Sequence, residues 1–304
     1  MTTTTAGGTA APQAAAPAEA GPAPRTLRRG ERGRGASLAL HATLIVASFI
    51  AVFPVIWIAW VSLGPDKMDF LHAGDIAGKM TLDNYTKVLG DTEFLNWMLN
   101  SLVVGIGTCV LGLFVSASAG YAVSRMRFPG HRQLMWTFLV TQMFPIAILI
   151  VPIYNLAASL DLLDTYWVLI LANCTTAFPY CAWLMKGYFD TIPVEIDEAG
   201  RVDGLSPFGT FYRLVLPLAR PGLAVAAFYT FLTAWGEFAF ASVLMLSEDK
   251  YTLPIGLATF VSEHDQQWNL MAATGVLIAI PAAAFFYLVQ RHLVTGLTAG
   301  AAKS

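Results

Sequence analysis

Charged residues are scarce in this chain. Only 12% of its 304 residues are Asp, Glu, Lys or Arg, and 56% are hydrophobic. A soluble domain of this length has about 25% charged residues. Basic and acidic residues nearly balance, at 18 and 20, so no general attraction to nucleic acid is expected. The composition excludes an ordinary soluble domain and indicates a polytopic membrane protein.

Cysteine is also rare, and the patterns of reactive or metal-binding sites are missing. The three cysteines lie in apolar segments without a CxxC pair, which favours packing between helices over a metal or redox site. Gly74–Lys79 resembles a phosphate loop but is one residue short, and Met80 replaces the required Ser or Thr. With no metal-ligand set and no nucleophile triad, we expect no catalytic residue, no metal and no ATP hydrolysis by this chain.

The N-terminal segment lacks the apolar region and cleavage site of a signal peptide. Residues 1–37 are rich in Thr, Ala, Pro and Gly and then carry five arginines. We expect residues 1–37 to form a disordered cytoplasmic tail.

Six apolar segments are each long enough to cross a bilayer core of about 30 Å. Five contain no charged residue, and the other contains only Glu237. The expected spans are Ala42–Ser62, Ser101–Val123, Leu134–Tyr154, Thr165–Met185, Pro221–Leu246 and Leu270–Val289. The sequence therefore predicts an all-α polytopic membrane protein, with a six-helix transmembrane domain over residues 38–295 and a C-terminal tail over residues 296–304.

The distribution of basic residues predicts the orientation of these spans. With the N-terminus inside, 14 Lys and Arg residues fall on the inner side and 4 on the outer side. Because cytoplasmic loops carry the excess of Lys and Arg, we expect both termini inside a plasma or inner membrane.

A charged segment, residues 191–217, separates the fourth and fifth spans on the predicted cytoplasmic side. Thr191 and Pro193 suit the start of a helix, Gly204 suits a turn, and Ser206-Pro207 suits the start of a second helix. One face of the first helix would carry small or short side chains suited to close approach of a partner: Ile196, Ala199, Gly200 and Asp203. An ordinary amphipathic connector is the alternative interpretation.

The spacing within this segment resembles the pattern E-A-A-x3-G-x9-I-x-L-P, which is typical of permease subunits of binding-protein-dependent ABC importers. Here Gly200 replaces the second Ala, and Leu214 replaces Ile. Other segments resemble the MalG-like sugar permeases of the maltose-transporter type. They are Thr81–Leu89, Asn100-Ser101, Ala119–Gly130, Trp235–Phe238, Thr252–Leu257 and Gly296–Ser304. The resemblance extends from about residue 38 to the C-terminus.

This resemblance implies the ABC importer permease fold, with a cytoplasmic coupling helix. It implies a second permease subunit, two ATPase subunits that bind ATP and Mg, and an extracytoplasmic solute-binding protein. The imported sugar would be maltose, maltodextrin or a related oligosaccharide such as trehalose. The ATPase-coupling residues would be Glu198, Ala199, Gly200, Asp203, Gly204, Phe208, Leu214, Leu216 and Pro217. Binding-protein docking would involve Leu253, Pro254, Gly256 and Trp268, and the tail would contact the ATPase dimer.

Three residues are candidates for the translocation pathway. Glu237 is an intramembrane carboxylate, which is costly and functional by default. A hydrogen bond between helices and a proton relay are its alternatives. Trp235 is a candidate for sugar stacking, and Asn173, with Thr175 and Thr176, for the pathway or for polar helix packing. Glu237 also keeps open a second function, a self-contained ion-coupled sugar transporter.

Overall fold

The structure is a computed structural model that describes residues 34–65, 76, 78–126, 128–261 and 267–301, together with residue 2. Most of the predicted tail, residues 1–37, lies outside the described residues, but a helix already begins at Arg34. The chain divides into two units, Met1–Val52 and Phe53–Ser304. The first unit contains the beginning of helix α1 (Arg34–Ser62), whose apolar side chains are largely exposed.

The second unit is built from helices, which confirms the predicted all-α class. After the end of α1, its longer helices are α2 (Asp83–Gly90), α3 (Phe94–Arg125), α4 (His131–Thr141), α5 (Ile146–Ser159), α6 (Tyr166–Phe189), α7 (Glu195–Val202), α10 (Arg220–Trp235) and α13 (Trp268–Ala301). Its short elements are α8 (Pro207–Thr210), the π-helical turn η2 (Phe211–Val215), α9 (Leu216–Leu218), α11 (Ala241–Leu244), the 3-10 turn η3 (Glu248–Lys250) and α12 (Leu253–Ala258).

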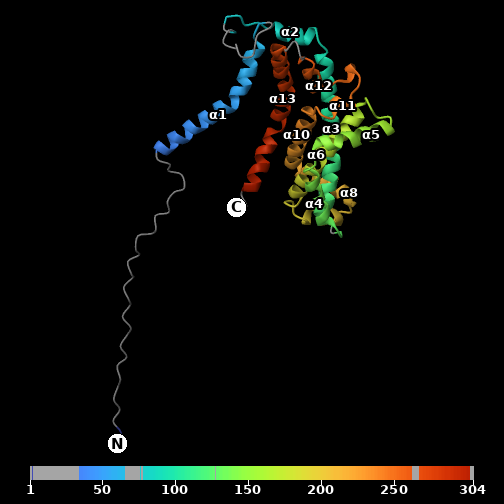
Figure 1. The fold of residues 1–304 in the computed structure, drawn as a ribbon. Coiled ribbons are helices and arrows are strands. Elements are labelled where there is room, and N and C mark those ends of the chain that lie inside the picture. Colours follow the sequence, from blue (N-terminus) through green and yellow to red (C-terminus); the bar gives the residue numbers. More distant parts are fainter. Residues whose placement is uncertain are drawn as a thin grey trace. The chain divides into compact units, whose positions relative to one another are not determined.

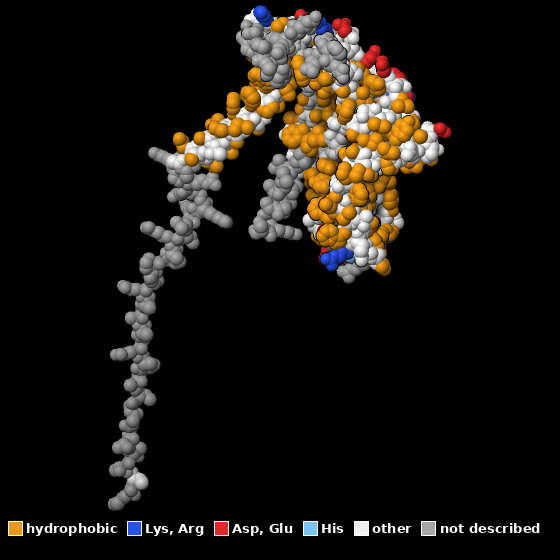
Figure 2. All heavy atoms as spheres, in the orientation of Figure 1, with side chains coloured by type: hydrophobic (Ala, Val, Ile, Leu, Met, Phe, Trp, Pro, Cys, Tyr) orange, Lys and Arg blue, Asp and Glu red, His pale blue; other side chains and the backbone are white. Residues whose placement is uncertain are grey.

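Four helices are long and apolar enough to cross a membrane, and they match four of the six predicted spans. Their crossing segments are Ser37–Ser62, Phe94–Arg125, Tyr166–Phe189 and Trp268–His292. Figure 2 shows hydrophobic side chains along the helices of the second unit, with charged side chains near its two ends. This distribution suits a protein surrounded by lipid.

The other two predicted spans are not continuous helices. Within Leu134–Tyr154, helices α4 and α5 meet at a bend of 102°. Pro145 precedes α5, and proline removes a backbone donor and disfavours helix at the residue before it. Within Pro221–Leu246, α10 ends at Trp235, and the chain turns before the four-residue α11. The two breaks place irregular backbone among apolar helices, which membrane proteins tolerate where it lines a cavity or is buried in protein.

Small residues hold the centre of the second unit together. Helices α3, α6 and α10 pack against one another, and α13 packs against α10 (Figure 1). Gly112, Ser116 and Gly120, which are spaced four residues apart, are all buried on α3. A Cβ at Gly120 would lie 2.9 Å from the backbone nitrogen of Lys186 on α6. The glycine therefore permits a backbone approach that a side chain would prevent.

The tail expected over residues 296–304 begins as a continuation of α13, which is helical through Gly296 to Ala301. Residues 302–304 lie outside the described residues.

Candidate functional site

Helix α7 is fixed to the end of α3 by a buried ion pair. The Arg125 Nε atom lies 2.9 Å from Asp197 Oδ2, and the two side chains are 10% and 6% exposed. The Tyr121 hydroxyl donates to Asp197 Oδ1 at 2.5 Å, and Arg125 Nη2 donates to the Ile192 carbonyl at 2.8 Å. Sequence analysis missed this anchor because its partners are 72 residues apart in the chain.

The segment after α7 turns back on it as predicted. Gly204 has φ of +78°, a conformation that favours glycine. Ser206 caps α8 by accepting a hydrogen bond from the Gly209 amide at 3.1 Å, with Pro207 in the first turn. The predicted cap at Thr191 is wrong, because α7 begins after Val194 and the Thr191 hydroxyl donates to the Tyr188 carbonyl.

Gly200 has a different neighbour from the one expected. Its small size was attributed to the approach of a partner, but Gly200 is buried against the chain's own second helix. An added Cβ would lie 2.7 Å from Thr210 Oγ1 and 3.0 Å from Leu214 Cδ1. The glycine therefore allows α7 to pack tightly against α8 and η2.

Four of the predicted coupling residues surround one surface hollow of about 460 Å³ between α7 and η2–α9. Its lining consists of Ala199, Asp203, Leu214 and Pro217, with Ile196, Arg213 and Leu218. Glu198 is exposed, and so is Phe208, whose ring stacks on Tyr212 with centroids 6.5 Å apart. Leu216 packs instead with the buried cluster around Phe211 and Val215.

A cavity of about 490 Å³, with both polar and apolar walls, lies where the two broken spans meet α6. It is lined by Thr141, Gln142, Phe144, Ile146, Leu149, Thr175, Thr176, Tyr229, Thr233, Gly236, Glu237, Phe238, Ala239 and Phe240. The Glu237 carboxylate accepts hydrogen bonds from the amides of Phe240 at 2.6 Å and Ala241 at 3.0 Å. Glu237 thus caps α11 and also lines the cavity.

The other two pathway candidates lie elsewhere. Trp235 is 5% exposed and stacks on Phe231, with ring centroids 5.2 Å apart. Asn173 is fully buried on α6, and no partner for its side-chain amide is present among the described residues. Thr175 and Thr176, by contrast, line the cavity with Glu237.

The predicted docking residues form the base of a loop. Leu253 is buried, and its amide donates to Ser101 Oγ at 2.8 Å. Gly256 lies directly against the Trp97 ring, while Pro254 and Trp268 are partly exposed. Residues 262–266 of the expected docking loop lie outside the described residues. The residues that the structure describes therefore fix α12 to α3.

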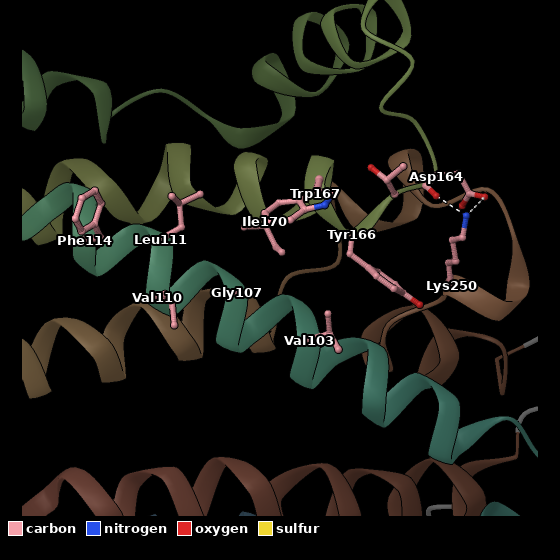
Figure 3. Close-up of a pocket in the computed structure, with 11 residues that line it drawn as sticks. Val103, Gly107, Val110, Leu111, Phe114, Asp164, Tyr166, Trp167, Ile170 and Lys250 are labelled. Atoms are coloured by element: carbon pink, nitrogen blue, oxygen red, sulfur yellow. Dashed lines mark hydrogen bonds and ion pairs between the residues drawn. The ribbon is translucent and has the colours of Figure 1, made fainter.

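A larger groove of about 840 Å³ follows α3 and α6 and is almost entirely apolar (Figure 3). Its polar groups are at one end, where Lys250 Nζ lies 3.2 Å from Asp164 Oδ2. Burial would raise the pKa of Asp164, but hydrogen bonds from Ser247, the Leu246 amide and Lys250 outweigh it and lower the pKa to about 2. The apolar walls make this groove a poor site for a polar solute.

Comparison with known proteins agrees with this architecture. Residues 110–298 match the family described as "Binding-protein-dependent transport system inner membrane component". The chain is 39% identical over 230 residues to the maltodextrin transport system permease protein MdxG of Bacillus subtilis strain 168, covering 75% of this chain and 83% of MdxG. It is 34% identical over 264 residues to the trehalose transport system permease protein SugB of Mycobacterium tuberculosis strain CDC 1551 / Oshkosh, covering 86% and 95%.

The fold is also shared with a solved structure. A chain of a bacterial ABC transporter for import of the acidic polysaccharide alginate superposes with a TM-score of 0.71 at 23% identity, covering 86% of this chain and 99% of that one. The family consists of transport components rather than enzymes, and its ATPase is a separate subunit. The chain therefore belongs to the inner membrane components of binding-protein-dependent transport systems, as a MalG-like permease subunit of an ABC importer.

Proposed function

We propose that this chain forms part of the pathway of an ATP-driven importer for an oligosaccharide of the maltose, maltodextrin or trehalose type. The names of the relatives support the cargo class, since MdxG is a maltodextrin permease and SugB a trehalose permease. The observation that carries the coupling role is the hollow between α7 and η2–α9, because it gathers Ala199, Asp203, Leu214 and Pro217 at one surface.

The hollow receives a side chain or helix end of the ATPase subunit. Asp203 lines the hollow, and the same 191–217 segment carries other exposed groups, the acidic Glu198 and the apolar Val202 and Phe208. A partner with basic and apolar side chains matches this surface. The buried pair of Arg125 with Asp197 then transmits movement of the ATPase to α3. This is rigid-body switching between two packed states.

The remaining assembly follows from this role. A second permease subunit completes the pathway, and two ATPase subunits bind ATP and Mg, so this chain needs no cofactor of its own. The 191–217 segment and both termini lie on the cytoplasmic side, where the excess of Lys and Arg is expected. An extracytoplasmic solute-binding protein docks on the opposite side, near α12 (Leu253–Ala258) and the segment that leads to α13.

Uptake by proteoliposomes tests this proposal. Vesicles holding the complete assembly, with binding protein outside and ATP inside, should accumulate radiolabelled maltose or trehalose. Vesicles holding this chain alone, under a proton or sodium gradient, should not. Gradient-driven uptake by the chain alone would instead support the ion-coupled transporter.

A further inference from the structure

Two helix breaks that are distant in sequence open onto the same cavity of mixed polar and apolar lining. The turn between α4 and α5 contributes Thr141, Gln142 and Phe144, and the turn after α10 contributes Gly236–Phe240. Helix α6 contributes Thr175 and Thr176. Thr175 lies about 14 Å along α6 from Tyr166, at about 1.5 Å per residue. This depth is close to the middle of a hydrocarbon core of about 30 Å, where discontinuous helices form solute sites.

The polar groups of this cavity are mainly hydrogen-bond acceptors. Each lining threonine donates its own proton to a carbonyl of its own helix, at 2.7 to 2.9 Å: Thr141 to Phe138, Thr175 to Ala172, Thr176 to Asn173 and Thr233 to Tyr229. Only the lone pairs of these hydroxyls remain for a solute. The Gln142 amide nitrogen donates to the Thr176 carbonyl at 2.9 Å, which leaves the amide oxygen and one N–H for a solute.

Glu237 adds a carboxylate whose position is fixed. Both of its oxygens accept backbone amides at the start of α11, and each keeps further acceptor capacity. Among the described lining residues, none is Lys, Arg or His. Aromatic rings complete the wall, including Tyr229, which packs on Tyr180 with centroids 4.4 Å apart.

We infer that this cavity is a solute-binding half-site within this chain, for a neutral polyhydroxylated solute. Such a solute supplies hydroxyl donors to the threonine oxygens, the Gln142 oxygen and the Glu237 carboxylate, and its apolar faces suit aromatic walls. The volume of about 490 Å³ falls within the range of about 300–1,000 Å³ for small-molecule sites. This inference rests on the proposed function, because it assigns the imported oligosaccharide to particular residues.

The double variant Thr175→Val/Thr233→Val tests the half-site, because valine keeps the shape of threonine but removes the acceptor. In proteoliposomes with the complete importer, uptake of dilute radiolabelled maltose should fall about 25-fold, from about fivefold for each of the two lost hydrogen bonds. ATP hydrolysis stimulated by the binding protein should stay at the wild-type level. Discrimination between maltose and its monodeoxy analogues should shrink, which a merely structural defect would not cause.

Two controls separate binding from folding. Thr137→Val removes a hydroxyl with the same bond to its own helix, on the exposed face of α4, and should leave uptake unchanged. Thr175→Ser/Thr233→Ser keeps both hydroxyls and should retain uptake. Wild-type uptake and discrimination in the valine variant would overturn the half-site, and preferred uptake of a cationic amino sugar would overturn the neutral solute. A wild-type importer that moves no oligosaccharide would instead refute the proposed function.

Discussion

Asp197 is the acidic residue through which the 191–217 segment is anchored, and its partner is Arg125 at the end of α3. Their 2.9 Å ion pair is buried, with side chains 6% and 10% exposed. The Tyr121 hydroxyl and the Ile192 carbonyl complete the hydrogen bonds of the pair. The exposed Glu198 and Asp203 lie on the same short helix or at its end, so α7 separates an anchoring carboxylate from surface carboxylates.

Breaking this pair should destabilise the protein. Asp197→Ala leaves the Arg125 guanidinium buried without its carboxylate, and we expect a loss of about 3 kcal/mol in the free energy of unfolding. Denaturant titration in detergent micelles measures it. Asp203→Ala, at an exposed carboxylate, should change stability by less than about 0.5 kcal/mol. Equal effects of the two substitutions would contradict the anchor.

Gly200 and Thr210 should show strong energetic coupling. Gly200→Ala places a Cβ 2.7 Å from Thr210 Oγ1 and 2.8 Å from Thr210 Cγ2, so we expect a loss of about 1–3 kcal/mol from overpacking. Thr210→Ala in the same chain removes both atoms and should recover most of this loss. A double-mutant cycle by the same titration checks it, and additive effects would show that the two residues do not meet.

The Asp164–Lys250 pair predicts a pH-dependent stability. Because the pKa of folded Asp164 is about 2, below its ordinary value of 3.8, its stabilisation is present above about pH 4 and is lost as the pH falls towards 2. Asp164→Asn should cost about 1–2 kcal/mol at pH 7, allowing for partial exposure, and the difference from wild type should vanish near pH 2.

Asp161→Asn is the matched control for this pH dependence. Asp161 lies in the same loop with the same left-handed backbone, at φ of 53° against 57° for Asp164, and is exposed. Asparagine tolerates that conformation in both positions. A constant Asp164→Asn effect between pH 7 and pH 3 would reject the assigned role of the carboxylate.

The contact of Gly256 with the Trp97 ring should fix α12. Gly256→Ala forces the ring to move, and we expect a loss of about 1–3 kcal/mol and weaker docking of the solute-binding protein. Gly187→Ala, where no atom lies within 4 Å, should be neutral or stabilising in its helix. Thermal unfolding and binding-protein titration on the assembled importer measure both effects.

Much of this architecture could be predicted from hydropathy and local signals. Four helices long and apolar enough to cross a membrane, the turn at Gly204 and the cap at Ser206 depend on neighbouring residues alone, and the structure has all of them. The break after Trp235 was missed, because apolar composition does not show where a helix ends. The Arg125–Asp197 pair and the Gly200–Thr210 contact depend on tertiary packing, which one sequence does not show.

The coupling role of the 191–217 segment is the central claim, and Glu198→Lys in the complete importer tests it most directly. Reversing this exposed charge beside the hollow leaves the buried anchor intact, so the subunit should fold normally. The importer should then bind its ATPase subunits weakly and lose ATP-driven uptake of maltose or trehalose. Wild-type assembly and uptake in the Glu198→Lys importer would contradict the account.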